Sequence, residues 1–352
     1  MPYYAGLDLH RSMSVICLKD AEGRLIRRGR VANDPVALGQ FFAGCDGEPV
    51  FVALEATTNY AWMYDTLERL GCRVELAHPL KVRAIASARI KTDRIDAEVL
   101  CDLRRANLLP TSYVPPPPIR DLRELLRHRM RLVHDRTRVK NRLTTVLAKV
   151  NLTCPGTDPF GRKSQDYLAT VSLPSVFAGQ RDDGLAHLEF LNGQITRIDR
   201  QLRLIAKEYP QADRLRTIPG IGIFSALLIL AESGEIARFP SAKQLVSYSG
   251  LAPGVYQSAN TRHGRGITRQ GSRHLRWILI QNALHAMRSP GPLRQCYLRL
   301  AHGKGHGKAI TAVARKLLVG IYKVLHDGKS FCPSEIRENI QRSPLQVPGP
   351  SR

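Results

Sequence analysis

The sequence predicts a mixed α/β domain at the N-terminus, an α-helical middle region with coiled-coil character, and a mainly α-helical C-terminal domain. Three patterns support this prediction: short apolar runs alternate with helical periodicity early in the chain, heptad repeats follow, and apolar helical stretches come last. With 352 residues, of which 43% are hydrophobic, the chain is long enough to build more than one core. We place the domains at residues 1–112, 113–212 and 213–330, and we expect a disordered tail at 331–352.

The N-terminal domain begins with three strand-like runs and then alternates strands with helices. Compact or alternating apolar runs predict strands, and helically spaced runs between them predict helices. Asp34 is suited to cap the first helix. The predicted strands cover residues 3–8, 12–19, 25–31, 49–55 and 73–77, and the predicted helices cover 36–42 and 60–70. This order predicts a sheet that is partly antiparallel.

The middle region carries two heptad patterns. The prolines at 115–118 predict an extended spacer. Beyond them, Leu125 starts a row of apolar residues at seven-residue intervals on one face of a long, arginine-rich helix. After an irregular stretch at 152–184, a second apolar seam runs from Leu188 to Ile205 in steps of three and four residues. The two helices can pair within one chain or between two chains, and periodicity does not decide which.

The C-terminal domain opens on a turn that contains Gly220 and Gly222. The run Pro-Gly-Ile-Gly resembles a helix-hairpin-helix turn, whose backbone N–H groups contact DNA phosphates. A tight glycine turn between two packed helices is an equally good interpretation. The next residues, 223–232, are almost all apolar and predict a core helix. Residues 302–308 lack the residues that a P-loop requires, and we interpret them as a basic turn before a helix at 309–325.

The net charge of +23 is distributed unevenly along the chain. Residues 1–110 hold 15 Lys and Arg against 14 Asp and Glu, whereas the rest of the chain holds 38 against 16. A strongly basic region is typical of proteins that bind nucleic acid. The sequence shows no apolar run of membrane-spanning length and no signal peptide, and its 7 cysteines lack CxxC spacing. We therefore expect a cytoplasmic protein without a membrane partner.

Four acidic residues lie at predicted strand ends or at the start of a predicted helix, which are common positions for catalytic residues in α/β proteins. Asp8 and Glu55 each end a predicted strand, and Asp93 and Asp96 lie three residues apart at the start of a predicted helix. Carboxylates held so close together favour a divalent cation between them, and four of them can hold a pair of metal ions. Taken alone, Asp8 or Glu55 is better explained as an ordinary strand-end acid, and the Asp93–Asp96 pair is equally well explained as a solvated helix start. Their combination and order predict a metal site.

Ser258 lies in a glycine-rich stretch that contains many arginines. A serine among phosphate-binding arginines can act as a nucleophile toward a phosphodiester, although serine is also common in loops. The following helix, which Ser272 is suited to cap, is expected to direct Arg273 and Arg276 outward. Together with Gly220 and Gly222, the predicted nucleic-acid contacts are Arg262, Arg265, Arg269, Arg273 and Arg276.

Two segments resemble one protein family. The run 91–97, Lys-Thr-Asp-Arg-Ile-Asp-Ala, together with the strand-end Asp8 and Glu55, resembles the RuvC/RNase H-like domain of the DEDD transposases in the IS-one-ten insertion-sequence family. That family includes Piv-type DNA invertases and bridge-RNA-guided recombinases. The pattern Gly-Leu-x-Pro…Gln-Ser…Gly-x-x-x-Leu-Arg, which contains Ser258, resembles the transposase domain of the same family. Ala259 departs from the family pattern, in which glycine often follows the serine.

The resemblance implies a recombinase of a mobile element. Asp8, Glu55, Asp93 and Asp96 would bind Mg²⁺ (or Mn²⁺), and Ser258 would become covalently joined to DNA. The implied partners are double-stranded DNA at the element ends and the target, a noncoding guide RNA, and further copies of the chain in a homodimer or homotetramer. Different protomers would supply the acids and the serine of one active site. The implied location is the bacterial cytoplasm, in association with the nucleoid.

Three other interpretations are compatible with the sequence. A RuvC-like, metal-dependent junction nuclease would use the four acids alone. A Piv-type site-specific DNA invertase would act without RNA. A non-enzymatic nucleic-acid scaffold would use the acids only structurally.

Overall fold

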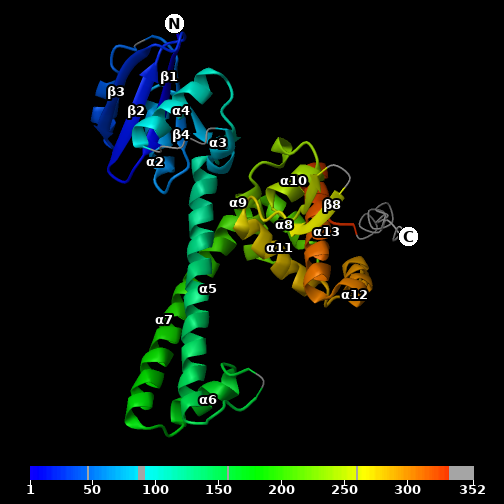
Figure 1. The fold of residues 1–352 in the computed structure, drawn as a ribbon. Helices are drawn as coiled ribbons and strands as arrows, with labels where there is room; N and C mark the ends of the chain where they lie inside the picture. The colour runs from blue at the N-terminus through cyan, green and yellow to red at the C-terminus, as the bar shows by residue number, and fades with distance from the viewer. Residues whose placement is uncertain (46, 86–91, 157, 259–260, 333–352) are drawn as a thin grey trace. The chain divides into compact units, whose positions relative to one another are not determined.

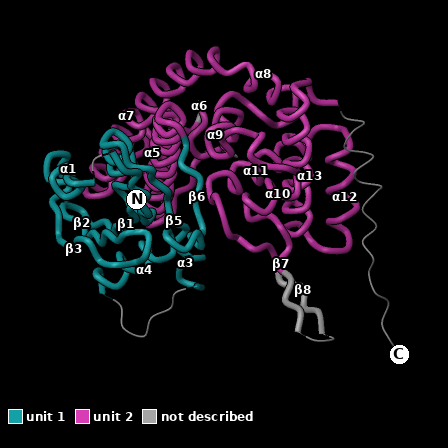
Figure 2. Tube along the Cα trace, turned by 90° about the horizontal axis from the view of Figure 1, so that it is seen from above, with its two compact units in different colours: residues 1–115 teal, residues 116–352 magenta. Residues whose placement is uncertain are grey.

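The computed structural model describes the chain except residues 46, 86–91, 157, 259–260 and 333–352, and it leaves aside the side chains of residues 162–163 and 255–265. The chain divides into two compact units, Met1–Pro115 and Pro116–Arg352, drawn in teal and magenta in Figure 2. The first unit is mixed α/β and the second is mostly helical, as the sequence predicts. The predicted disordered tail, 331–352, lies outside the described residues from 333 onward.

The first unit is built on a six-stranded mixed sheet (Figure 1). Its strands are β1 (Tyr3–Leu9), β2 (Met13–Lys19), β3 (Leu25–Ala32), β4 (Val50–Glu55), β5 (Arg73–Ala77) and β6 (Thr111–Ser112), in the spatial order β3-β2-β1-β4-β5-β6. β4 pairs in parallel with both β1 and β5, and the other pairings are antiparallel. The predicted strands and helices of this domain are confirmed. Asp34 caps α1 (Pro35–Phe42) by accepting the backbone N–H groups of Val36 and Ala37.

Helices cover both faces of this sheet. Successive side chains on a strand point to opposite faces. Ala5 and Leu7 of β1 pack in a core with Leu38 of α1 and Met63 of α2 (Tyr60–Arg69). The opposite face is covered by α4 (Asp93–Arg105), which packs on β1, β2 and β4; α3 (Pro79–Ile85) follows β5. The strand residues between the core positions, Asp8 among them, therefore lie on the α4 side.

α4 approaches β1 so closely that only glycine fits at position 6. A Cβ atom on Gly6 would lie 2.0 Å from the carbonyl oxygen of Ala97 and 2.4 Å from the amide nitrogen of Cys101. Both are backbone atoms of α4, so the helix itself would have to move to admit a side chain. Because α4 carries Asp93 and Asp96 in its first turn, Gly6 sets how near these acids come to the sheet.

Ion pairs fix α4 on the neighbouring strands. Lys19 of β2, only 7% exposed, donates to Asp102 Oδ1 at 2.8 Å and lies 3.3 Å from Glu98 Oε1. Arg28 of β3 donates to the other carboxylate oxygen of Glu98 at 2.6 Å. These contacts lie one and two turns beyond the acids at the start of α4, and they hold the helix against rotation about its axis.

The second unit begins with an antiparallel hairpin of two long helices, α5 (Pro117–Lys149) and α7 (Ser175–Ile205). Val139 and Leu143 of α5 share a core with α7, and nearer the other end Arg129 donates to both carboxylate oxygens of Asp199, at 2.5 and 3.1 Å. The two heptad helices thus pair within one chain. The prediction of an irregular stretch at 152–184 is wrong in part, because α6 (Arg162–Thr170) and the start of α7 lie in it.

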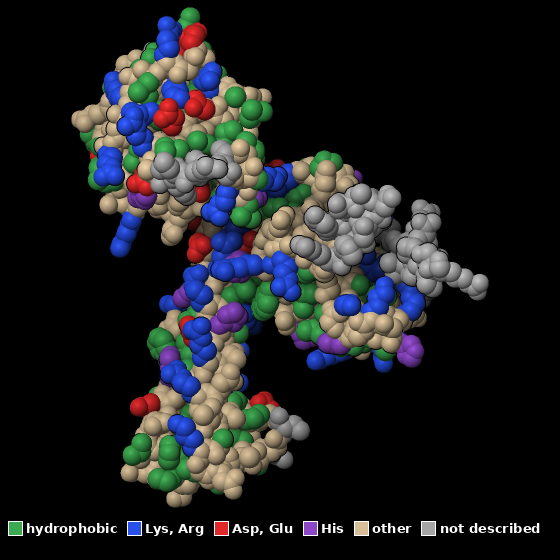
Figure 3. Space-filling model, viewed as in Figure 1, with side chains coloured by type: hydrophobic (Ala, Val, Ile, Leu, Met, Phe, Trp, Pro, Cys, Tyr) green, Lys and Arg blue, Asp and Glu red, His purple; other side chains and the backbone are tan. Residues whose placement is uncertain are grey.

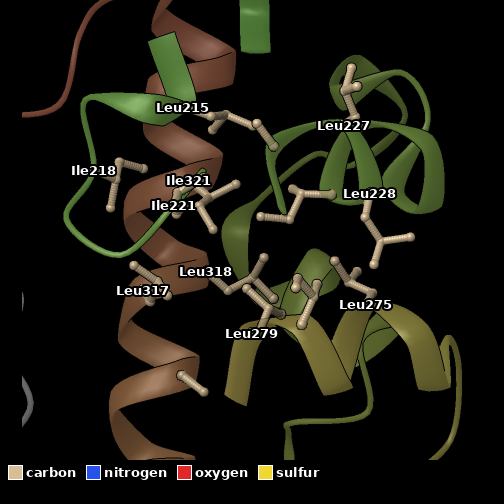
Figure 4. Close-up of a cluster of buried hydrophobic side chains, with 14 of the residues drawn as sticks. Leu215, Ile218, Ile221, Leu227, Leu228, Leu275, Leu279, Leu317, Leu318 and Ile321 are labelled. Atoms are coloured by element: carbon tan, nitrogen blue, oxygen red, sulfur yellow. The ribbon is translucent and has the colours of Figure 1, made fainter. Parts of the chain in front are cut away.

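The remaining helices surround a second core. They are α8 (Pro210–Arg216), α9 (Ile223–Ser233), α10 (Ala242–Tyr248), α11 (Arg273–Ala286), α12 (Pro292–Lys304) and α13 (His306–Asp327), with short 3-10 turns at Ala206–Glu208 and Ile236–Arg238. Figure 4 shows Leu228, Leu279 and Leu318 converging from α9, α11 and α13. A two-stranded hairpin, β7 (Pro253–Ser258) and β8 (Thr261–Ile267), interrupts the helices at a place where no strand was predicted.

None of the described helices has the length and hydrophobicity to cross a membrane.

Two predictions about helix ends are corrected by the structure. The prolines do not form one extended spacer, because Pro117 starts α5 and only the preceding residues stay outside the helix. Proline is tolerated there because the first residues of a helix need no N–H donor. The predicted basic turn at 302–308 is shorter than expected: α12 runs to Lys304 and α13 begins at His306, with Gly305 at φ 76° between them.

A buried glutamate joins four helices of the second unit. Glu232, near the end of α9, is 2% exposed. Arg127 of α5 donates from Nε and Nη2 to its Oε1 at 3.0 and 2.8 Å, and Ser272 Oγ donates to its Oε2 at 2.9 Å. Ser272 also caps α11 by accepting the N–H of Leu275, and Tyr248 of α10 donates to the Glu232 carbonyl. One carboxylate therefore sets where α11 begins relative to α5 and α9.

Gly6→Ala is expected to lower the free energy of unfolding of the first unit by about 1–3 kcal/mol, because overpacking a helix–sheet contact forces the backbone apart. Urea denaturation followed by the fluorescence of Trp62, in a Trp277→Phe background, measures this. Gly29→Ala in β3 is the control, since its Cβ would meet Phe41 at an ordinary 3.6 Å. Equal stability of the two variants would contradict the prediction.

Glu232→Ala is expected to lower the free energy of unfolding of the second unit by about 3 kcal/mol. The substitution leaves the guanidinium of Arg127, which is largely removed from water, without its carboxylate partner. Urea denaturation followed by Trp277 fluorescence, in a Trp62→Phe background, measures the loss. Glu235→Ala, an exposed acid close by in sequence, is the control and should cost little. A double variant, Arg127→Met with Glu232→Leu, should recover much of the stability. No recovery would mean that packing, and not the stranded charge, dominates.

Candidate metal centre and nucleic-acid contacts

At one end of the sheet in the first unit, Asp8 and Asp93 lie within ligand range of one another, and Glu55 and Asp96 lie near enough for their charges to act on Asp8. Asp8, near the end of β1, is 8% exposed, and Glu55 is the last residue of β4. The two strands are adjacent and parallel in a register that pairs Leu7 with Leu54, so the next residues along lie side by side. The negative charges of Asp93, Asp96 and Glu55 all act on Asp8. Lys91, in the same sequence motif, lies outside the described residues.

The start of α4 is fixed by a threonine cap. Thr92 has extended backbone angles, φ −137° and ψ 152°, and its Oγ1 accepts the N–H of Ile95 at 3.3 Å. Its carbonyl oxygen accepts the N–H of Asp96 at 3.0 Å. The cap places Asp93 and Asp96 in the first turn, where the free N–H groups of the helix favour negative charge.

His10 belongs to the same cluster. Its Nε2 lies 3.3 Å from Asp8 Oδ2 and 3.1 Å from Asp93 Oδ2, and the ligand atoms of the three residues lie within 4.8 Å of one another. Neighbouring ligands of an octahedral ion with bonds of about 2.1 Å stand about 3 Å apart. The His10 nitrogen has a similar spacing from both carboxylates, which is also the spacing of an ion pair, and Asp8, His10 and Asp93 form a group that could hold a metal ion.

Two loop asparagines hold His10 in place. The His10 carbonyl accepts the side-chain amides of Asn33 at 2.9 Å and Asn59 at 3.1 Å, and its N–H donates to the Met13 carbonyl at 3.1 Å. The sequence prediction gave His10 no part in a site. The spacing Asp-Leu-His was the available signal, because residues two apart on an extended chain share a face.

The electrostatics of Asp8 favour neutralisation by a cation. Burial raises the pKa of Asp8 above its ordinary value, His10 lowers it, and the nearby charges of Asp93, Asp96 and Glu55 raise it further. The carboxylate is therefore costly to ionise where it stands. A bound proton removes this cost at low pH, and a divalent cation would remove it at neutral pH.

A cavity of about 610 Å³ beside Asp93 offers cationic groups for phosphates. Thr92, Arg28, Arg30 and Arg94 are among its lining residues. Arg28 is engaged with Glu98, whereas Arg30 and Arg94 are exposed, with Arg30 Nη2 only 3.9 Å from Asp93 Oδ2. Guanidinium groups suit phosphate oxygens, so a phosphodiester next to the acids would find positive partners on this wall.

Ser258 lies in the second unit, as the last residue of β7, and its backbone pairs with Thr261 of β8. The side chains of Ser258, Arg262 and Arg265 lie outside the described part of the chain. The assignment of Ser258 as nucleophile stays a prediction.

The other predicted arginines differ in exposure. Arg269 and Arg273 are exposed, and Arg269 follows β8 with φ at 56°. Arg276 is half-buried, and its Nη1 donates to the Ser249 carbonyl at 3.0 Å. The expectation that Arg276 points outward is wrong, because the guanidinium satisfies a carbonyl at the end of α10. Nucleic-acid contact by these arginines stays a prediction.

The structure supports the packing interpretation of the predicted glycine turn, and DNA contact by this turn stays a prediction. Gly220 has φ 89°, and a Cβ there would lie 2.8 Å from the carbonyl oxygen of Asn282, so the turn packs directly on α11. Gly222 precedes α9 without a side-chain cap, and a Cβ there would have no atom within 4 Å. The first glycine therefore serves packing, and the second leaves open backbone at the start of a helix.

Basic side chains line the helical hairpin and the C-terminal helices, as the visible face in Figure 3 shows. Several of them serve the fold. Arg127 and Arg129 bind acids in the interior, and Lys140 lies 4.8 Å from the centre of the Phe160 ring. Others, such as Arg138 with a side chain 78% exposed, remain accessible to a polyanion.

Asp8→Asn is expected to stabilise the metal-free chain at pH 7. Because the pKa of Asp8 is raised in the folded state, folding loses stability as pH rises from the ordinary value of 3.8 through the raised value, and asparagine avoids this loss. We expect a Tm about 2–4 °C above that of the wild type, the shift typical of a modest single-site gain. The difference should shrink as pH falls toward 3.8.

Calorimetry with and without Mg²⁺ checks the same variant. The wild-type Tm should rise with Mg²⁺ and that of Asp8→Asn should not, because the variant has a neutral amide in place of a carboxylate that would bind the cation. Glu68→Gln, an exposed acid on α2, is the control and should follow the wild type. An equal Mg²⁺ response in wild type and Asp8→Asn would argue against a metal centre at this cluster.

Two family models match the chain. A transposase model of the DEDD type, for the IS110 group, matches residues 5–152, which contain all four acids. A model described as transposase IS116/IS110/IS902 family matches residues 212–298, which contain Ser258. Together the two matches cover about two thirds of the chain.

Similar proteins include transposases and an inverting protein. The chain is 29% identical to the transposase for insertion sequence element IS1328 of Yersinia enterocolitica, over 79% of this chain and 82% of that protein. It is 27% identical to the transposase for IS1111A of Coxiella burnetii, over 88% and 86%. It is 33% identical to the pilin gene-inverting protein of Moraxella bovis, over 43% and 48%. The matched regions include both motifs on which the resemblance rested, and the chain belongs to the IS110/IS116/IS902 family of transposases.

Proposed function

We propose that the chain is the DNA transposase of an insertion sequence, which cleaves and rejoins DNA with a metal-binding acid cluster in its first unit and Ser258 in its second. The observation that supports this most directly is the group formed by Asp8, His10 and Asp93 at one end of the sheet, with Glu55 and Asp96 near enough for their charges to act on Asp8. Two relatives named as transposases match 79% and 88% of the chain.

The fold of the first unit is proposed to be RuvC/RNase H-like. Its first three strands are antiparallel neighbours, and β4 and β5 follow in parallel on the other side of β1. Asp8 and Glu55 stand at the ends of the two central strands β1 and β4, and α4 supplies the remaining acids. This strand order and the position of these acids support the proposal.

The proposed chemistry is a phosphodiester exchange. Ser258 Oγ attacks a phosphorus atom of the DNA backbone and loses its proton; a serine–phosphate bond forms, the bond to the 3′ oxygen breaks, and that oxygen leaves as a hydroxyl. A 3′-hydroxyl of the partner strand then attacks the phosphoserine and releases the serine. Each step replaces one phosphate ester by another, so the exchange needs no nucleotide cofactor.

The acids would hold Mg²⁺ or Mn²⁺, which when bound supplies positive charge to the scissile phosphate. The residues of the protein do the positioning. Thr92 fixes the start of α4, the asparagines fix His10, and Arg30 and Arg94 give the neighbouring phosphates cationic partners. The basic second unit provides surface for double-stranded DNA and for a guide RNA.

A homo-oligomer is part of the proposal. The acids and Ser258 belong to different compact units of the chain, so a site can be completed by the serine of another protomer. A homodimer or homotetramer would then be the active form, as the family resemblance implies.

Ser258→Ala is expected to abolish a covalent protein–DNA product, with a rate loss of about 10³-fold or more, as when the nucleophile of other covalent enzymes is removed. The assay incubates the full chain with Mg²⁺, labelled element-end DNA and the RNA that copurifies from cells, and a denaturing gel detects labelled DNA attached to protein. Ser241→Ala, an exposed serine of the same unit without a cap hydrogen bond, is the control.

The other interpretations predict different gels. A junction nuclease would give free cut ends without adduct, and Ser258→Ala would not change them. An invertase that acts alone would form the adduct equally well after the RNA is digested. A scaffold would cleave nothing, and Asp96→Asn would leave its nucleic-acid binding intact.

A further inference from the structure

A second cavity, of about 580 Å³, lies within the second unit beside the glycine turn. The turn residues Gly220 and Gly222 form part of its wall, and α11 contributes Trp277, Gln281 and Asn282. It belongs to neither the acid cluster nor the β7–β8 hairpin that carries Ser258. It is an open depression, and its lining combines backbone at the turn, an indole ring and two amide side chains.

Asn282 gives the clearest sign that this cavity takes a ligand. It is 1% exposed, and its Oδ1 accepts the hydroxyl of Ser225 at 2.9 Å. Its Nδ2 is buried and has no hydrogen-bond partner among the described residues. Flipping the amide would only exchange which of its two atoms is unpartnered. Buried amides are nearly always satisfied, so this orphaned donor on a residue that lines the cavity calls for a partner that the described residues do not supply.

The start of α9 adds unsatisfied donors to the same wall. Gly222 stands at the N-cap without a side chain to accept the first N–H groups, and Phe224 and Ser225 of the first turn also line the cavity. Such N–H groups bind phosphate oxygens when no cap competes for them. A smaller cavity of about 450 Å³ shares Ile221, Gly222 and Phe224 with this one and adds the basic side chains of Arg203 and Arg216.

The two aromatic residues that line the cavity differ in whether a ligand can stack on their rings. Phe224 is covered by Arg129, whose guanidinium carbon lies 4.3 Å from the ring centre. Trp277 is half-buried, and no described ring or guanidinium stacks on it. An indole beside unsatisfied amides is suited to a flat, hydrogen-bonding group, and nucleobases stack on such rings.

We infer that this cavity binds one unpaired nucleotide of a nucleic-acid strand, with the base against Trp277, the base edge at the Asn282 amide, and the phosphate at the turn after Gly220 and the adjoining arginines. The inference rests on the proposed nucleic-acid function and adds a site for single-stranded substrate. A duplex is expected to use it much less well, because a paired base leaves its stack only at a free-energy cost.

The test compares Trp277→Ala with Trp277→Phe in the full chain. Fluorescence anisotropy measures binding to a labelled oligo(dT) strand and to the same strand paired with oligo(dA). The alanine variant should bind the single strand about 5- to 150-fold more weakly, the range found for loss of one base–aromatic stack. Its affinity for the duplex should stay within about twofold, and phenylalanine should restore most of the single-strand binding. Oligo(U) in place of oligo(dT) distinguishes an RNA strand from a DNA strand as the occupant.

A second readout uses the protein's own fluorescence. The chain has 2 tryptophans, and Trp62→Phe leaves Trp277 as the sole emitter. Oligo(dT) should quench this emission, and the duplex should not. Equal weakening of both probes by Trp277→Ala, or no quenching by the single strand, would overturn the inference and leave Asn282 as the ligand of a buried water. Failure to bind either probe in the wild type would instead count against the proposed function as a whole.

Discussion

The contact between the backbone of α4 and Gly6 of β1 is the constraint on which the acid cluster depends. A helix normally stands off a sheet by the length of the side chains between them. Here the absence of a side chain lets Ala97 and Cys101 approach the strand backbone directly. The first turn of α4 then lies close enough to the sheet for Asp93 and Asp8 both to contact His10 Nε2. Moving the helix outward by the width of a methyl group would break that shared contact.

Charge in this chain serves two purposes, which its total does not reveal. Buried pairs such as Arg127 with Glu232 and Lys19 with Asp102 hold helices in place, and they remove those cations from any binding surface. Beyond residue 110 the chain still holds 38 Lys and Arg against 16 Asp and Glu, and this excess gives the second unit the electrostatic character of a polyanion binder. The basic face of α5 is thus partly a structural device, and only part of it is free for DNA or RNA.

The proposed reaction distributes its groups over two units with different physical properties. The acids sit on strand ends and a capped helix start, where ion pairs and close packing fix them within the first unit. Ser258 stands at the tip of a two-stranded hairpin in the second unit. A rigid electrostatic centre and a nucleophile on a separate element suit a reaction in which strands must be cut and then exchanged. The unpaired-nucleotide cavity beside Gly220 would serve the strand that such an exchange releases.

The sequence by itself determined the strands and helices of the first unit and the family, and it singled out the four acids as candidates. Strand alternation and strand-end position are local properties, and the spacing of Asp93 and Asp96 needs only helical geometry. The tertiary structure alone decided the pairing of α5 with α7, the inward turn of Arg276, the burial of Glu232, and the entry of His10 into the acid cluster. Each of these depends on which elements pack together, and contacts between residues far apart in sequence leave no periodic signal in the chain.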